Sequence, residues 1–248
     1  MARKKFNLDS QALDGFTMMV HGGRAAGKTH LMGDFLAHEK AKGHIRFINV
    51  LGEDGTLTIS GMGLGAIAET VESYEDFLAA CKEYQDSGVH AVALDSLSVL
   101  GRWVCKKVLG GADRAPRISK EGNEWGDFHR EMDIAMLRLR QAARYVLCAC
   151  PSDKSADQLT GITYISPDLP GRQAVGSAGW FDFVGFLKAD VVGPKKIERK
   201  LVIAPNSTIV VRQRLPKQIV EDIVLPDGPG GWAKIKQAYI NHGAGGSL

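Results

Sequence analysis

Largely apolar runs of about six residues alternate with stretches of helical spacing over the first 150 residues. The runs 16–21, 45–50, 89–94 and 145–150 are typical of strands that are covered on both faces of a sheet. Between them, apolar residues three and four apart predict helices at 28–42, from a Ser73 cap through Tyr84, and at 124–144. This alternation predicts a parallel sheet with helical crossovers.

The last third of the chain has a different pattern. Short apolar runs at 181–187, 200–204 and 208–212 predict strands, with a hairpin turn at 205–207 and a helix at 233–240. These strands are expected to extend the sheet with antiparallel pairs. Two segments, 101–123 and 151–180, show no clear element, and loops of that length are usually functional or disordered.

We expect one domain over 15–240, preceded by a basic arm at 1–14 and followed by a flexible tail at 241–248. A chain of 248 residues is long enough to bury a large core without disulfides. Its four cysteines and seven histidines show no metal-binding spacing, so reduced thiols are expected. No signal peptide or membrane span is recognisable, which predicts a cytoplasmic protein without membrane contact.

Residues 22–29 read GGRAAGKT, which matches the phosphate-binding pattern G-x-x-x-x-G-K-[ST] between a predicted strand and a predicted helix. A glycine-rich turn directs its N–H groups, with the positive end of the helix dipole, at phosphates. Lys28 is expected to reach the β- and γ-phosphates of ATP, and the Thr29 hydroxyl to ligate Mg²⁺. The expected nucleotide contacts are Gly22, Gly23, Arg24, Ala25, Ala26, Gly27, Lys28, Thr29 and His30.

Carboxylates follow two other predicted strands. Asp95 ends the strand at 89–94 and is expected to hold Mg²⁺ through water, with Ser96 in support. Glu53 and Asp54 follow the strand at 45–50, at the sheet edge where α/β proteins bind ligands. Either could polarise an attacking water, and we favour Glu53. The alternatives are a helix cap at Asp95 and an acidic surface turn at 53–54.

The stretches GGRAAGKTHL, FINVLGEDGT and VALDSLSVL are followed in order by EWGDFHREMDIAMLRLRQ, ISPDLPG and GWFDFVGF. Together they resemble the RecA-like ATPases, and more closely a bacteriophage RecA-core group associated with single-strand annealing and recombination. The similarity spans about residues 15–215. It implies a RecA-like P-loop NTPase core, an α/β fold whose mostly parallel central sheet has helices on both faces and an antiparallel C-terminal extension.

The resemblance also implies assembly and further roles. Subunits would associate head to tail on single-stranded DNA, as a filament or ring, with ATP between subunits and hydrolysis stimulated by DNA. A basic residue of the neighbouring subunit would reach the ATP, and Arg212 and Arg214 match it best, although either could be a solvated strand-edge charge. Segments 101–123 and 151–180 would be the DNA-binding loops. The family's polar or histidine sensor is replaced by the run from Cys148 to Ser152.

Charge is unevenly distributed along the chain. The net charge is only +3, but residues 188–217 hold eight Lys or Arg against two Asp or Glu, and residues 101–124 hold six against three. Trp103, Trp125 and Tyr164 are candidate stacking rings for single-stranded DNA, although Trp125 fits a core position better. The candidate DNA contacts are Arg102, Lys106, Lys107, Arg114, Arg117, Lys120, Lys154 and Arg172.

The sequence therefore predicts a Mg²⁺-dependent ATPase of RecA type that binds single-stranded DNA and supports phage recombination or strand annealing. Phage or host recombination proteins are expected as further partners, and the host cytoplasm is the expected location if the chain is phage-encoded. Two alternatives stay open. One is an ATP-switched protein that binds or anneals DNA with little turnover, and the other is a regulatory P-loop ATPase that does not act on DNA.

Overall fold

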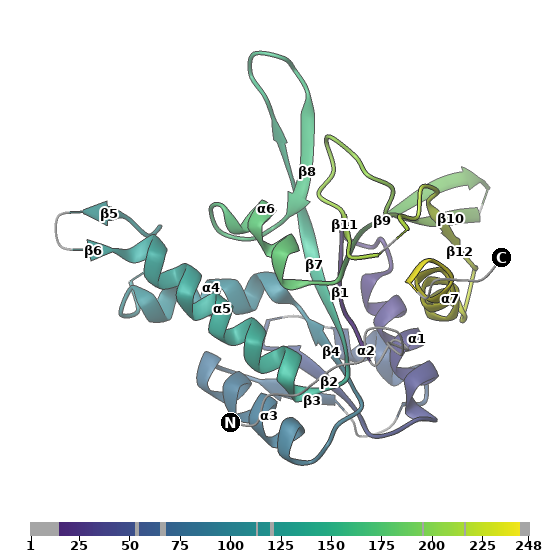
Figure 1. Ribbon diagram of the computed structural model, residues 1–248, viewed down its shortest axis with the longest axis horizontal. Coiled ribbons are helices and arrows are strands. Elements are labelled where there is room, and N and C mark those ends of the chain that lie inside the picture. Colours follow the sequence, from purple (N-terminus) through teal and green to yellow (C-terminus); the bar gives the residue numbers. More distant parts are fainter. Residues whose placement is uncertain are drawn as a thin grey trace.

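The computed structural model describes residues 15–52, 55–64, 68–112, 114–119, 122–194, 196–215 and 217–243. In this part of the chain a sheet of ten strands lies between two layers of helices (Figure 1). The predicted arm at 1–14 and most of the predicted tail, 244–248, lie outside the described residues. Within the described ranges, no helix combines the length and the apolar character needed to cross a membrane.

The sheet is parallel at its centre and antiparallel at one edge. Strands β3 (Ala68–Val71), β2 (Ile45–Val50), β4 (Ala91–Asp95), β7 (Tyr145–Ala156), β1 (Thr17–Gly22) and β9 (Phe183–Gly193) follow one another in parallel. Beyond β9, β10 (Lys196–Val202), β12 (Ile223–Leu225) and the short β11 (Arg212–Gln213) pair in antiparallel fashion. The predicted parallel sheet with an antiparallel extension is confirmed.

Both faces of the sheet are buried because its central strands are apolar on both sides. On β1, Met18 and Val20 pack into one core and Met19 packs into the other, as strand periodicity requires. Helices α1 (Lys28–Lys40), α2 (Gly55–Ser60) and α7 (Gly231–Gly243) cover the first face. Helices α3 (Tyr74–Asp86), α4 (Leu97–Val108) and α5 (Glu124–Ala142) cover the second (Figure 1).

The helix start that Ser73 indicated is present, and α5 has a polar cap that was not predicted. The Ser73 hydroxyl accepts a hydrogen bond from the Asp76 N–H at the start of α3, which confirms the predicted cap. At the start of α5, the Asn123 side chain accepts from the Gly126 N–H in the same way. The expected helices at 28–42, 73–84 and 124–144 therefore correspond to α1, α3 and α5.

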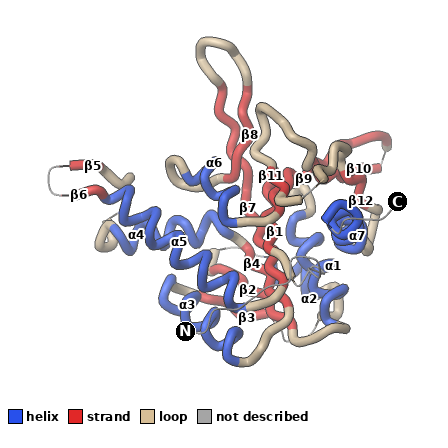
Figure 2. The backbone as a smooth tube through the Cα atoms, in the orientation of Figure 1, coloured by secondary structure: helices blue, strands red, loops and turns tan. Residues whose placement is uncertain are grey.

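The prediction that 101–123 and 151–180 lack regular structure is wrong. The first segment contains most of α4 and a small hairpin of β5 (Ile118–Ser119) and β6 (Gly122–Asn123). In the second, β7 continues to Ala156 and pairs with β8 (Thr163–Pro167), followed by α6 (Gln173–Gly176) and the 3₁₀ helix η2 (Ser177–Trp180). The β7–β8 hairpin projects beyond the sheet as an arm (Figure 2). Its polar outer half carries no apolar alternation. Besides its pairing with β7, β8 is bonded through Ile165 to Thr208 and Val210.

The predicted hairpin between 200–204 and 208–212 is also wrong. Strand β10 pairs with β9 and β12 instead. The Asn206 side chain accepts hydrogen bonds from the N–H groups of Thr208 and Ile209, a local turn that leads the chain toward β8. The turn residues were therefore recognised correctly, but the turn does not join two paired strands.

Helix α1 is joined to α7 by buried carboxylates. Asp34 accepts hydrogen bonds from the N–H groups of Gly230 and Trp232, at 2.8 and 2.7 Å, and so caps the start of α7. Glu39 is fully buried and accepts from Lys236 Nζ at 2.6 Å, Trp232 Nε1 at 3.0 Å and His90 Nε2 at 2.9 Å. These hydrogen bonds outweigh the cost of burial and lower the pKa of Glu39 to about 2.

We expect Glu39→Gln to lower the free energy of unfolding by about 3 kcal/mol at pH 7, because the Lys236 side chain, only 12% exposed, would lose its counter-charge. The folded pKa lies below the unfolded value, so this stabilisation is complete above about pH 4.5 and is lost as the pH falls toward 2. Urea unfolding followed by circular dichroism should therefore show a smaller penalty at pH 3 than at pH 7. A penalty equal at both pH values would contradict the assignment, and the exposed Glu83→Gln is the control.

Candidate functional site

The glycine-rich segment forms a tight turn between β1 and α1. Gly27 adopts a φ angle of +100°, in the left-handed region that glycine tolerates best. It also packs against the Arg199 side chain, because a Cβ on Gly27 would lie 2.9 Å from Arg199 Nε. A Cβ at Gly22 would lie 2.6 Å from the carbonyl oxygen of Leu187 on β9. Glycine is therefore required at both ends of the turn for close packing. Gly27 has no side chain to cap α1, which suits a helix start that faces a ligand.

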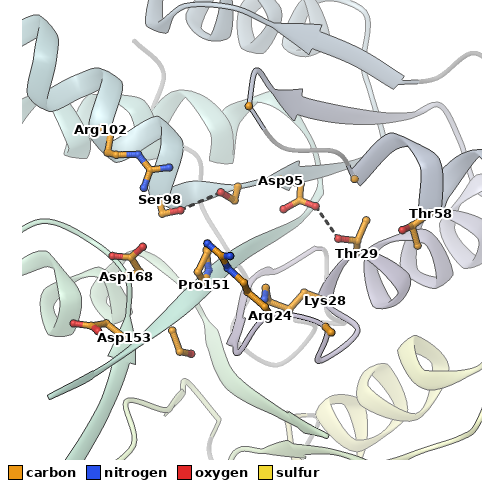
Figure 3. A pocket seen from close by; sticks show the side chains of 15 residues that line it. Arg24, Lys28, Thr29, Thr58, Asp95, Ser98, Arg102, Pro151, Asp153 and Asp168 are labelled. Atoms are coloured by element: carbon orange, nitrogen blue, oxygen red, sulfur yellow. Dashed lines mark hydrogen bonds between the residues drawn. The ribbon is translucent and has the colours of Figure 1, made fainter. Parts of the chain in front are cut away.

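The side chains of Lys28 and Thr29 turn back over the loop. Lys28 Nζ donates to the carbonyl oxygens of Gly22 and Gly23, both at 2.9 Å. The Thr29 hydroxyl donates to Asp95 Oδ2 at 2.9 Å (Figure 3). Asp95 is buried at the end of β4, so a contact between residues 66 positions apart joins the loop to a second strand.

A polar pocket of about 660 Å³ opens at the carboxyl ends of β1, β2 and β4, beside residues 151–153 of β7. Its loop side is formed by Arg24, Ala25, Lys28 and Thr29. Opposite them lie Arg102 and Ser98 of α4 with Asp153 and Asp168 from the two sides of the β7–β8 arm (Figure 3). The volume lies within the range of small-molecule sites, and the position is where open α/β sheets bind ligands. His30 is exposed and does not line the pocket.

Gly55, the first residue of α2, packs against the Thr29–Asp95 contact. A Cβ on Gly55 would lie 2.7 Å from Asp95 Oδ2 and 3.2 Å from Thr29 Cγ2. The hydroxyl and carboxylate oxygens of the pair are hard ligands of the kind that Mg²⁺ prefers, so the donor set fits this ion with water completing its coordination. In the described residues no cluster of three or more His, Cys, Asp or Glu could hold a metal by itself.

Glu53 and Asp54, the two candidates for water activation, lie outside the described residues. Gly52 and Gly55, which border them in the sequence, both line the pocket. The role of the acidic pair stays a prediction.

Arg212 and Arg214 lie beside the first half of β9. Arg212 pairs with Val184, and Arg214 Nη2 donates to the Gly179 carbonyl oxygen at 2.6 Å while Nη1 lies 3.3 Å from Asp182 Oδ1. Neither arginine lines the pocket. A role at the site of a neighbouring subunit therefore stays a prediction.

Three groups near the loop were missed by the sequence reading. Ser152 and Asp168 line the pocket, and Arg199 of β10 lies against Gly27 with its Nη1 3.7 Å from Asp227. Arg199 Nε is buried and has no hydrogen-bond partner among the described residues. The surplus of basic residues at 188–217 was the one signal for Arg199, whereas Ser152 and Asp168 become recognisable only when β7 and β8 are paired.

His21 links the loop strand to two other segments. Its ring is fully buried, Nε2 donates to the Val210 carbonyl oxygen at 2.7 Å, and Nδ1 lies 2.8 Å from the Ser152 hydroxyl. Burial, with a smaller contribution from the Lys28 ammonium, lowers the pKa of His21 to about 4, although the hydrogen bond to Val210 opposes the shift. At the position where the family's sensor was expected, Cys148 and Cys150 are buried in β7, and Ser152 is the polar group that reaches the pocket.

The candidate DNA contacts separate into groups. Arg102, Lys106 and Arg114 line a cavity of about 430 Å³, and Arg172 lines an adjoining one of about 480 Å³. Lys107 instead pairs with Glu131 at 3.0 Å and lies over the Tyr74 ring. Arg117 and Lys154 are exposed, on the β5–β6 hairpin side and on the β7–β8 arm, and Lys120 lies outside the described residues.

Comparison with protein-family models and with curated proteins finds no match to this chain. The chemistry of the pocket is therefore the main guide to its ligand. It combines the Lys28 ammonium and the two arginines Arg24 and Arg102 with the paired Thr29 hydroxyl and Asp95 carboxylate, and Asp153 and Asp168 also line it. Such a set can bind a polyphosphate together with a divalent cation.

We expect Gly55→Ala to weaken Mg²⁺-ATP binding about tenfold, because the new Cβ would push Asp95 away from Thr29. Titration with a fluorescent ATP analogue should show this loss with Mg²⁺ present and a much smaller one in EDTA. Gly193→Ala, where an added Cβ meets no atom within 4 Å, is the matched control. Unchanged affinity in Gly55→Ala would exclude the Thr29–Asp95 pair as the metal site.

Proposed function

We propose that the protein is a Mg²⁺-dependent ATPase of RecA type that binds single-stranded DNA and supports recombination or strand annealing in a phage. The observation that carries the proposal is the 2.9 Å contact between Thr29 and Asp95 beside Lys28. A phosphate-loop pattern alone is a sequence match. Here the loop, its threonine and a strand-end carboxylate from 66 residues away meet in one pocket, as ATP and Mg²⁺ require.

Each residue has a separate task in this proposal. Lys28 would leave the Gly22 and Gly23 carbonyl oxygens and stabilise negative charge on the β- and γ-phosphates. Thr29 and Asp95 would hold Mg²⁺, which neutralises charge on the phosphate oxygens. Arg24 and Arg102 supply further positive charge from opposite sides of the pocket. Glu53, or Asp54, would orient the attacking water.

Single-stranded DNA is favoured by the cations that surround the same end of the sheet. Arg102, Lys106 and Arg114 from the α4 region lie close to Arg172, which follows the β7–β8 arm. Two tryptophans, Trp103 and Trp125, line the same cavities. Basic residues combined with aromatic rings are typical of single-strand binding surfaces. The two segments implied as DNA-binding loops thus lie side by side, although each is more regular than a loop.

Assembly of several subunits completes the proposal. The exposed tip of the β9–β10 hairpin carries Val191, which is 81% exposed, with Val192 and Ile197, and apolar side chains grouped on a surface favour protein contacts. In a filament or ring, Arg212 or Arg214 of a neighbour would complete the charge at the ATP, which would lie between subunits.

We expect Lys28→Ala to reduce the ATPase rate at least about 10²-fold, because the cation that faces the transferring phosphate is lost. A steady-state phosphate-release assay with and without single-stranded DNA measures this, and the exposed Lys82→Ala is the charge control. Turnover by Lys28→Ala at the parental rate would rule out the site. If the parent binds ATP but Glu53→Gln leaves its slow turnover unchanged, the ATP-switched DNA-binding alternative is favoured.

We expect the affinity for a single-stranded oligonucleotide to fall as salt rises, with a log–log slope of about −0.7 for each phosphate that is neutralised. Arg172→Ala and Lys154→Ala should each make that slope shallower, and Lys82→Ala should leave it unchanged. Fluorescence anisotropy between 50 and 200 mM salt, roughly the range over which such contacts are lost, measures the slopes. Absence of DNA binding in an active ATPase would favour the regulatory alternative.

A further inference from the structure

Trp125, the second residue of α5, separates two adjoining cavities. One, of about 430 Å³, is bordered by Arg102, Lys106 and Arg114, and the other, of about 480 Å³, by His129 and Arg172. Trp125 and Gly171 line both of them. The cavities lie where α4, the start of α5 and the β5–β6 hairpin meet the chain that follows β8 (Figure 1).

The Trp125 ring is held in one orientation. It meets Phe128 edge to face, with centroids 6.0 Å apart, and lies nearly parallel to the His129 ring at 6.2 Å. The backbone of Gly171, at φ +58°, presses on it so closely that a Cβ there would lie 2.6 Å from Cζ3. The side chain is only partly buried, so the ring is a fixed platform with open space beside it.

Basic side chains predominate around this platform. The described residues that line the two cavities include Arg102, Lys106, Arg114 and Arg172, and none of them is Asp or Glu. Glu124 binds Arg114 through both carboxylate oxygens and so neutralises one of these cations. The surplus matches an anionic ligand that also presents a flat apolar face, which a nucleotide of a DNA strand does.

The uncharged polar side chains that line the cavities, Asn123 and His129, already have hydrogen-bond partners. The Asn123 side chain caps α5, and His129 Nδ1 lies 2.6 Å from the Gln173 amide nitrogen. Few groups are left to read the edge of a base, so recognition would rest on stacking and phosphate contacts. An occupant of this kind would be bound with little dependence on sequence.

Arg102 lines both the cavity of about 430 Å³ and the polar pocket that contains Lys28 and Thr29, so it connects the two. The chain from Asp168 to Gly171 makes the same connection: Asp168 lies in the phosphate pocket, and Pro170 and Gly171 line the cavity. This stretch packs on α4, since a Cβ at Gly101 would lie 3.2 Å from Leu169. The two sites therefore share one arginine and one short loop.

We propose that the cavities beside Trp125 form a stacking site for one unpaired base of a single-stranded DNA, with Arg102, Lys106 and Arg172 holding the adjacent phosphates. This inference rests on the proposed function, and it adds a specific base site to it. Arg102 also lines the polar pocket of about 660 Å³, so one side chain borders both sites.

The test compares a fluorescent oligothymidine with the same strand made abasic throughout its centre, in anisotropy titrations at constant salt. The variants are Trp125→Leu, Trp125→Phe and, as a control on the same helix, the exposed Leu137→Ala. The parent should bind the abasic strand more weakly than the normal one. Trp125→Leu should lose about tenfold in affinity for the normal strand and little for the abasic strand, with Trp125→Phe intermediate.

Equal affinity of the parent and Trp125→Leu for the normal strand would overturn the base site while leaving DNA binding and the ATPase proposal intact. Failure of the parent to bind either strand would overturn the base site and the DNA part of the proposed function together. If Trp125→Leu does not fold, as judged by thermal unfolding, Trp125→Phe and the parent's abasic comparison decide. The base site then fails if Trp125→Phe binds both strands as the parent does.

Discussion

The pairing of β7 with both β1 and β4 determines where the candidate site forms. All three strands run parallel, with His21 level with Cys150 and Leu94 level with Cys148, so the glycine-rich turn and Asp95 emerge at the same edge of the sheet. The 2.9 Å contact between Thr29 and Asp95 depends on this register. A shift of one residue in β7 would also exchange its two faces, because Cys148 and Cys150 face one core and Leu147 and Ala149 the other.

The far end of α1 contributes to the same site indirectly. Asp34 and Glu39 fix the helix to α7 and to His90 through hydrogen bonds of 2.6 to 2.9 Å between buried groups. Since Lys28 and Thr29 form the first turn of this helix, its position sets the depth at which their side chains enter the pocket. Asp34 and Glu39 thus help to position the site, although they lie farther along the helix than Lys28 and Thr29.

Much of the parallel sheet could be predicted from sequence because its strands are apolar on both faces and its helices carry clear stripes and caps, as at Ser73. The same reasoning missed α4, whose buried residues Leu97, Leu100 and Val104 are followed by a basic end, and it missed the β7–β8 arm, which has no core to mark it. At the site, Lys28, Thr29 and Asp95 could be predicted because each follows a strand. Ser152, Asp168 and Arg199 could not, since long-range pairing alone places them there.

The hydrogen bonds of His21 determine which way the Ser152 hydroxyl hydrogen points at the wall of the pocket. A carbonyl oxygen can only accept, so Nε2 carries the ring proton toward Val210, and with a pKa near 4 the ring is neutral and Nδ1 is an acceptor. The Ser152 hydroxyl must then give its hydrogen to Nδ1 at 2.8 Å, which leaves only lone pairs of its oxygen for a ligand. Ser152 can therefore receive a hydrogen bond from a water or an ammonium group, but it cannot offer one to a phosphate oxygen. A ligand group that binds to Ser152 must therefore be a hydrogen-bond donor.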